Sequence, residues 1–221
     1  MSDLHWAPSP VLLDAVLTLT IYSMQAPSLY DYLFHSSGRN HVRVEKFDKG
    51  SYIYQPGDEL AQIFLIEKGA VKIGSYSNDG ERVIYDVLQP GETFGDLDYL
   101  DDHGIEFFEF ARAMTSVTLM AIDRDYFKHI VVHDPVASEW FNVAVVRRWW
   151  KAETRLLHMT RGDIEARLSV LRKEYDKTIT DNAGYRHNLF SLLSHQELAD
   201  LTGTTRQTIS KKLKNNLEPA L

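Results

Sequence analysis

Glycine is concentrated in one part of this sequence, and that concentration restricts the fold more than any other feature. Eight of the twelve glycines lie between residues 50 and 104, where they separate short runs rich in Val, Ile, Tyr and Phe. Short apolar runs with turn residues at such regular spacing predict an antiparallel sandwich or barrel. The segment at 77–81, Ser-Asn-Asp-Gly-Glu, contains the residues that a tight hairpin requires. The sequence therefore predicts an antiparallel β roll over residues 42–124.

The composition is that of a globular protein without thiols. Of the 221 residues, 44% are hydrophobic and 25% are charged, which is enough apolar material for a packed core. The absence of cysteine excludes disulfides, thiolate zinc sites, cysteine-ligated iron–sulfur clusters and a cysteine nucleophile, and it is compatible with a reducing cytosol. No apolar run approaches the roughly 20 residues that cross a bilayer. The sequence therefore predicts a cytoplasmic protein that does not contact a membrane.

Residues 134–160 have the apolar period of one long helix. Two neighbouring stripes of this segment follow the helical repeat. One stripe can cover the β roll, whereas the second needs another surface, which the same helix of a second copy would supply. We therefore expect a homodimer, and the alternative is a central helix in a monomeric core. The residues expected in the dimer interface are Trp140, Val143, Val146, Trp150 and Leu157.

Two helix starts ten residues apart indicate a helix-turn-helix at residues 194–213. Ser194 with Glu197, and Thr204 with Gln207, have the spacing of capping boxes, in which a hydroxyl and a longer side chain satisfy the first backbone N–H groups of a helix. Gly203 lies between the two helices and can adopt the left-handed conformation of the turn. The sequence therefore predicts two short packed helices near the C-terminal end.

The second of these helices has the chemistry of a DNA-reading surface. Residues 1–160 carry 14 basic and 23 acidic side chains, whereas residues 161–221 carry 10 and 8, and the segment 206–214 has four cations and no acid. Arg, Lys and Gln can bond to base edges, and Thr, Ser and Lys can hold phosphates. A plain αα-hairpin would explain the apolar pattern equally well but not the missing acids. The residues expected to contact DNA are Thr205, Arg206, Gln207, Ser210, Lys211 and Lys214.

Four segments occur together in an order that is typical of one known family. They read Gln-Pro-Gly-Asp at 55–58, Ile-Glu-Lys-Gly-Ala-Val at 66–71, Pro-Gly-Glu-Thr-Phe-Gly-Asp-Leu at 90–97 and Gly-Thr-Thr-Arg-Gln-Thr-Ile-Ser-Lys at 203–211. With them the chain resembles the cyclic AMP receptor and FNR type (CRP/FNR) of bacterial transcription regulators. The resemblance implies an α+β fold with an effector-sensing double-stranded β-helix of the cyclic-nucleotide-binding kind at 1–133, a dimerisation helix at 134–160 and a helix-turn-helix domain at 161–221. It also implies a homodimeric regulator that binds double-stranded DNA, with RNA polymerase as a further candidate partner.

The effector site departs from the cyclic-nucleotide binders of that family. In those proteins an arginine neutralises the cyclic phosphate, whereas Phe107 stands at the matching place here, with Glu109 beside it and Arg112 on the opposite face of its strand. Because a buried phosphate would then lack a cation, cyclic AMP is not expected to bind. Two alternatives stay open, a pocket for an apolar or aromatic small-molecule effector and a plain aromatic core. The residues expected to line such a pocket are Phe94, Gly95, Asp96, Leu97, Phe107, Phe108, Trp149 and Trp150.

The remaining expectations concern what the chain lacks. The β-hairpin wing that commonly follows the recognition helix is expected to be missing or vestigial, which supports an alternative function as a regulatory or scaffolding protein that does not bind DNA. No catalytic residue is expected, because no nucleophile with a nearby base and no His-x-His motif are found. No metal site is expected, and a haem is not expected because no histidine pair has the spacing of haem ligands and a lone histidine is usually structural. The histidines considered are His41, His103, His129, His133 and His158.

Overall fold

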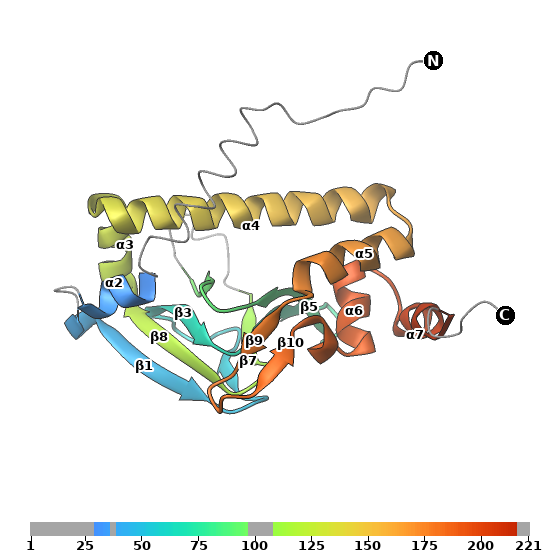
Figure 1. The fold of residues 1–221 in the computed structure, drawn as a ribbon, viewed down its shortest axis with the longest axis horizontal. Coiled ribbons are helices and arrows are strands. Elements are labelled where there is room, and N and C mark those ends of the chain that lie inside the picture. The colour runs from blue at the N-terminus through green and yellow to red at the C-terminus, as the bar shows by residue number, and fades with distance from the viewer. Residues whose placement is uncertain (1–28, 36–38, 97–107, 216–221) are drawn as a thin grey trace, which may run out of the picture.

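The computed structural model describes residues 29–35, 39–96 and 108–215 (Figure 1). A short helix α2 (Leu29–His35) and a 3-10 turn η1 (Arg39–His41) precede eight strands. The strands are β1 (Val42–Phe47), β2 (Tyr52–Tyr54), β3 (Gln62–Lys68), β4 (Val71–Tyr76), β5 (Arg82–Leu88), β6 (Thr93–Phe94), β7 (Phe110–Ala113) and β8 (Val117–Asp123).

The strands form two antiparallel four-stranded sheets, in the orders β1-β8-β3-β6 and β2-β7-β4-β5. Side chains of both sheets, among them Phe64, Ile73 and Leu119, fill a shared core. Gly69 turns the chain from β3 to β4 with a φ of +87°, and a Cβ there would lie 2.6 Å from the carbonyl oxygen of Ser116. Only glycine accommodates both conditions. The β roll predicted over residues 42–124 is confirmed.

Two helices follow the roll and meet at Asp134. Helix α3 (Arg124–His133) packs on the first sheet through Phe127 and Ile130, and α4 (Pro135–Arg161) is a single helix of 27 residues. The Asp134 side chain accepts hydrogen bonds from the backbone N–H groups of Val136 and Ala137 at 2.9 and 3.0 Å, and so caps α4. Figure 1 shows α4 lying along one side of the roll, from α3 at one end to α5 at the other. The long helix predicted at 134–160 is therefore present, with bounds that differ by one residue.

The last part of the described chain contains the two predicted helices and a hairpin that was not predicted. Helix α5 (Ile164–Tyr175) precedes the antiparallel strands β9 (Thr178–Thr180) and β10 (Arg186–Asn188) and the turn η2 (Phe190–Leu192). Then come α6 (His195–Thr202) and α7 (Arg206–Asn215). Strands of three residues are too short to show an alternating pattern, so no periodicity indicated the hairpin.

The apolar core of the helix-turn-helix continues into the β roll. Leu198, Leu201 and Ile209 belong to the same buried cluster as Ile84 and Phe110 of the second sheet. A backbone hydrogen bond extends this contact, since the N–H of Gly69 donates to the carbonyl oxygen of Thr180 on β9 at 2.9 Å. Because the contact is apolar and buried, the helix-turn-helix is held against the sheet rather than merely tethered by α4. Within the described residues no helix is long and apolar enough to cross a membrane.

Candidate functional site

The turn between α6 and α7 is fixed by backbone geometry and by one arginine. Gly203 has a φ of +62° and ends α6, and the N–H of Thr204 donates to the carbonyl of Ala199 at 3.0 Å. The guanidinium of Arg167 donates to the carbonyl oxygens of Thr202 at 3.0 Å and Met159 at 2.8 Å. It thereby ties the C-terminal ends of α6 and α4 to α5.

One predicted cap is confirmed and the other is wrong. At the start of α6, Ser194 and Glu197 form the capping box that the sequence predicted. At the start of α7, the Thr205 hydroxyl accepts the N–H of Thr208 at 3.2 Å, so the cap is Thr205 rather than Thr204. The helix begins one residue later because the chain needs Thr204 to complete the turn after Gly203.

The predicted DNA-contacting residues lie on the outer side of α7. Ile209 is fully buried against α6, and this orients the opposite face of the helix outward. Ser210 is half-buried, and its hydroxyl lies 2.9 Å from Nδ1 of His195. Lys212 is drawn aside, since its ammonium bonds to Glu165 of α5 at 2.5 Å. The exposed residues are Thr205, Arg206, Gln207, Lys211 and Lys214.

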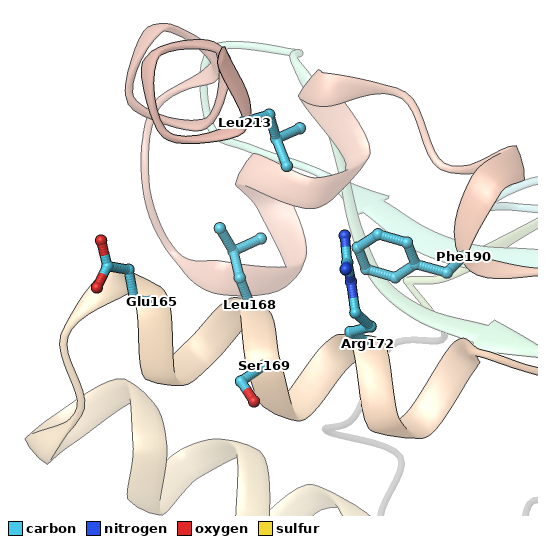
Figure 2. Close-up of a pocket in the computed structure, with 6 residues that line it drawn as sticks. All are labelled: Glu165, Leu168, Ser169, Arg172, Phe190 and Leu213. Atoms are coloured by element: carbon cyan, nitrogen blue, oxygen red, sulfur yellow. The ribbon is translucent and has the colours of Figure 1, made fainter. Parts of the chain in front are cut away.

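A cavity of about 220 Å³ lies on the other side of α7, between that helix, α5 and η2 (Figure 2). Figure 2 shows Leu168 and Leu213 facing each other across it, and Arg172 beside Phe190. The Arg172 guanidinium lies 5.1 Å from the centre of the Phe190 ring, a cation–π contact. This cavity is a gap between packed elements, and it lies away from the outer face of α7 that is expected to read DNA.

The capping box of α6 is also an ion-pair site for the β roll. The ammonium of Lys72 on β4 bonds to one carboxylate oxygen of Glu197, and the other oxygen accepts the N–H of Ser194 at 2.8 Å. Burial opposes ionisation of Glu197, but the Lys72 and Ser194 bonds outweigh it and hold its pKa below the usual range. Asp200 adds a second link, because its carboxylate accepts the backbone N–H of Ile84 at 3.1 Å.

A buried charge cluster joins β5, α4 and α5. The ammonium of Lys151 lies 2.7 Å from Asp86 and 2.9 Å from Glu174, and Arg155 lies 3.2 and 2.7 Å from the same two carboxylates. Burial by itself would raise the pKa of Asp86, but the charges of Lys151 and Arg155 have the larger combined effect. The pKa of Asp86 is therefore below its usual range. Burial raises the pKa of Tyr175, which packs in the same cluster. Local sequence patterns did not indicate this cluster, because its members come from three elements that are distant along the chain.

The residues expected in the dimer interface do not share one environment. Trp140 packs against the cluster between α3 and the first sheet, and Val143 is half-buried. Val146, Trp150 and Leu157 are exposed by 61%, 73% and 54%. Trp149 and Leu156 are also exposed, so the outer side of α4 carries a long apolar surface.

Of the residues expected to line an effector pocket, those that the structure describes are not brought together. Phe94 is buried in the core of the roll, where the centre of its ring lies 5.3 Å from that of Phe64. Phe108 is exposed by 56%, and Trp149 and Trp150 are exposed as well, so these three do not enclose a cavity. Gly95 and Asp96 are half-buried beside the strand end. Leu97 and Phe107 lie outside the described residues.

Polar groups that the pocket prediction did not include gather nearby. Glu109 accepts hydrogen bonds from the hydroxyls of Tyr54, at 2.7 Å, and Tyr85. Burial, together with the charge of Glu109, raises the pKa of both tyrosines. Arg148 of α4 donates to the carbonyl of Thr93 at 3.2 Å.

Arg112 points away from this cluster. Its guanidinium donates to the carbonyl of Gly50 at 2.7 Å and lies over the ring of Tyr52. Its strand neighbours Ala111 and Ala113 are fully buried in the core between the sheets. Arg112 is therefore on the opposite face from the core, as its odd spacing in the strand predicted.

The β roll, the long helix and the helix-turn-helix together are the architecture of a class of transcription regulators. Residues 44–134 match the cyclic nucleotide-binding domain family. The global nitrogen regulator of Synechococcus elongatus is 25% identical over 181 residues, which cover 80% of each chain. A CRP-like cAMP-activated global transcriptional regulator of Mycobacterium tuberculosis is 24% identical over 167 residues, covering 76% of this chain and 74% of that protein.

Solved structures show the same architecture. A CooA mutant from Carboxydothermus hydrogenoformans has a TM-score of 0.63 at 22% identity and covers 86% of this chain and 84% of its own. A transcriptional regulator of the CRP family from Thermus thermophilus has a TM-score of 0.61 at 22% identity and covers 80% and 88%. Together these matches show that the chain has the fold of the CRP/FNR transcription regulators and is similar in sequence to members of that family. Its relatives are regulators rather than enzymes, as the sequence predicted, and the scaffolding alternative is not favoured.

Proposed function

We propose that this regulator binds duplex DNA sequence-specifically as a homodimer, with α7 as the recognition helix. The observation that carries the proposal is the outer face of α7, where the exposed Arg206, Lys211 and Lys214 have no acid between them in a chain of net charge −7. Such a local excess of cations attracts phosphates even on an acidic protein. The fixed turn before α7 adds support, because a reading helix must be held rigidly.

The residues of this face fall into two groups, those suited to contact base edges and those suited to contact phosphates. Arg206 and Gln207 begin the helix, where a guanidinium fork suits guanine O6 and N7 and an amide suits adenine. Thr205, Lys211 and Lys214 suit phosphates. The Ser210 hydroxyl lies against His195 and can bind DNA only if that contact opens. We therefore assign Ser210 and His195 together to contacts with the DNA phosphate backbone.

The exposed apolar side of α4 supports dimerisation. Val146, Trp150 and Leu157 lie on one helix, and the same surface on a second copy would bury them around a two-fold axis. A dimer of this kind presents two α7 helices to half-sites about one helical turn, roughly 34 Å, apart. RNA polymerase remains a candidate partner with no residue assigned to it.

We further propose that the β roll responds to an effector other than cyclic AMP. A cyclic phosphate near Glu109 would meet a carboxylate that already accepts two tyrosine hydroxyls. The nearby cation, Arg148, opposes the rise in the pKa of both tyrosines, but its hydrogen bond goes to the carbonyl of Thr93 rather than to Glu109. An apolar or aromatic small molecule stays the proposed effector class.

The DNA proposal is tested by selecting a binding site from random duplexes and measuring affinity by fluorescence anisotropy at several salt concentrations. Arg206→Ala is expected to weaken the selected site by roughly 1–3 kcal/mol and relax the preference at one base pair. Lys214→Ala is expected to weaken all sequences alike and reduce the salt slope by about 1. Lys173→Ala is the matched control, because Lys173 is an exposed cation on α5. Equal losses for Arg206→Ala and Lys173→Ala would mean that α7 does not read DNA.

A further inference from the structure

Two histidines stand one turn apart on an exposed face of α3. His129 and His133 are separated by four residues, and both side chains are exposed. Their ring centres are 4.6 Å apart and their planes are inclined by 47°. Residues four apart become neighbours once the segment is a helix, so the two imidazoles lie side by side.

We propose that His129 and His133 form a binding site for a divalent first-row transition-metal ion such as Zn²⁺, Ni²⁺ or Cu²⁺. Two histidines at this spacing on one helix face are a recurring zinc-binding arrangement. Imidazole nitrogens lie about 2.0–2.1 Å from bound zinc, so two of them sharing an ion lie within about 4 Å of each other. Rings whose centres are 4.6 Å apart reach that geometry by side-chain rotation alone, and their exposure leaves such rotation free.

The donor set determines which ions the site takes. Imidazole suits Zn²⁺, Cu²⁺ and Ni²⁺, whereas Mg²⁺ and Ca²⁺ prefer oxygen ligands. Among the described residues no group of three or more His, Cys, Asp or Glu side chains gathers around one point. The ion would therefore be held by two protein ligands and complete its coordination with water. Asp125 lies one further turn back on α3 and adds negative charge to the same face.

The site lies at the corner between α3 and α4. His133 is the last residue of α3, and the next residue, Asp134, caps α4 and accepts a hydrogen bond from the hydroxyl of Tyr32. An ion held by His129 and His133 would link the last two turns of α3 just before this cap. Because an ion that binds only the folded helix stabilises it, metal binding is expected to raise the melting temperature of the chain.

The test is calorimetric titration of tag-free protein with ZnCl₂ at pH 7.5, followed by titration with NiCl₂. The wild type is expected to bind one ion per chain, and His133→Ala is expected to lose at least about tenfold in affinity. His158→Ala is the matched control, because His158 is a single histidine on helix α4 and should leave binding unchanged. Circular dichroism verifies that each variant is folded.

A second readout distinguishes this site from histidines elsewhere in the chain. With one equivalent of Cu²⁺, the electron paramagnetic resonance spectrum of the wild type is expected to show two nitrogen ligands, and that of His129→Ala fewer. The zinc-induced rise in melting temperature should disappear in His129→Ala and in His133→Ala. Equal zinc affinity in the wild type and the His129→Ala, His133→Ala double variant, or no binding by the wild type, would overturn the proposal.

Discussion

Two regions of the molecule differ from the usual arrangement of side chains. The junction between the β roll and the helix-turn-helix contains charged side chains away from solvent, whereas the outer side of α4 exposes apolar ones. At the junction, Asp86 is buried, the side chains of Lys151 and Arg155 are only 17% and 12% exposed, and each of the three has a partner of opposite charge within 3.2 Å. On α4, Val146 and Trp150 are exposed. Buried charge is tolerated when it is paired, whereas a large exposed apolar surface marks a place where another surface binds. The first interface is complete within one chain, whereas the second is the proposed interface with another copy.

The largest effect is expected from charging the apolar side of α4. The double variant Val146→Asp, Trp150→Asp places four carboxylates in the proposed dimer interface and should weaken dimerisation by roughly 4 kcal/mol, about a thousandfold. Sedimentation velocity at micromolar concentration should show a monomer. Val132→Asp is the control, because Val132 is exposed by 62%, about as much as Val146, but lies on α3 rather than on α4. A double variant that sediments like the wild type would leave the apolar side of α4 without a partner.

A smaller loss, of about 3 kcal/mol in the free energy of unfolding, is expected for Asp86→Asn, because it leaves Lys151 and Arg155 with one carboxylate between them. Urea unfolding at pH 7 measures it. The comparison variant is Glu165→Gln, which removes the surface ion pair with Lys212 and should change stability by less than about 1 kcal/mol. If both variants lose equally, burial at the junction does not strengthen the pair.

The smallest effect concerns the link between β4 and α6. Lys72→Met should destabilise the fold by about 2 kcal/mol at pH 7, because it removes a charged hydrogen-bond partner of Glu197. The pKa of Glu197 is lowered in the folded chain, so this contribution is present above the unfolded value of roughly 4.3 and disappears as the pH falls through the folded pKa.

The difference in stability between the wild type and Lys72→Met should therefore shrink when urea unfolding is repeated at acidic pH. Lys46→Met, at an exposed position of β1, should show little change at either pH. A difference that stays constant as Glu197 becomes protonated would show that Lys72 acts through packing rather than through charge.

Local patterns predicted the elements of this protein well. The glycine spacing indicated the β roll, because turns require residues that tolerate a positive φ, and Gly69 and Gly203 take such values. The apolar period of 134–160 indicated one helix, and the Ser194–Glu197 spacing indicated the start of α6. The outward side of α7 followed from the burial of Ile209. These features depend on residues within a few positions of one another.

The pairing of distant residues was not predictable from the same patterns. Lys72 meets Glu197 across 125 positions, and Tyr54 meets Glu109 across 55, with no local signal at either end. The packing of Phe94 against Phe64 also depends on pairing between β3 and β6, which lie far apart along the chain. The hairpin of β9 and β10 depends on pairing between strands that are too short to show a period.

The sequence by itself determined the kind and approximate position of the β roll, the long helix and the two helices of the helix-turn-helix, because steric limits on φ and the periods of apolar residues act over a few neighbouring positions. Only the tertiary structure decided which charges are buried with partners and which apolar residues remain exposed. Trp140 and Trp150 belong to the same helical stripe, yet the first packs against the cluster at α3 and the second is exposed, because the first sheet and α3 cover only the early turns of α4. Burial depends on what folds back against a residue, and that is a property of the whole chain.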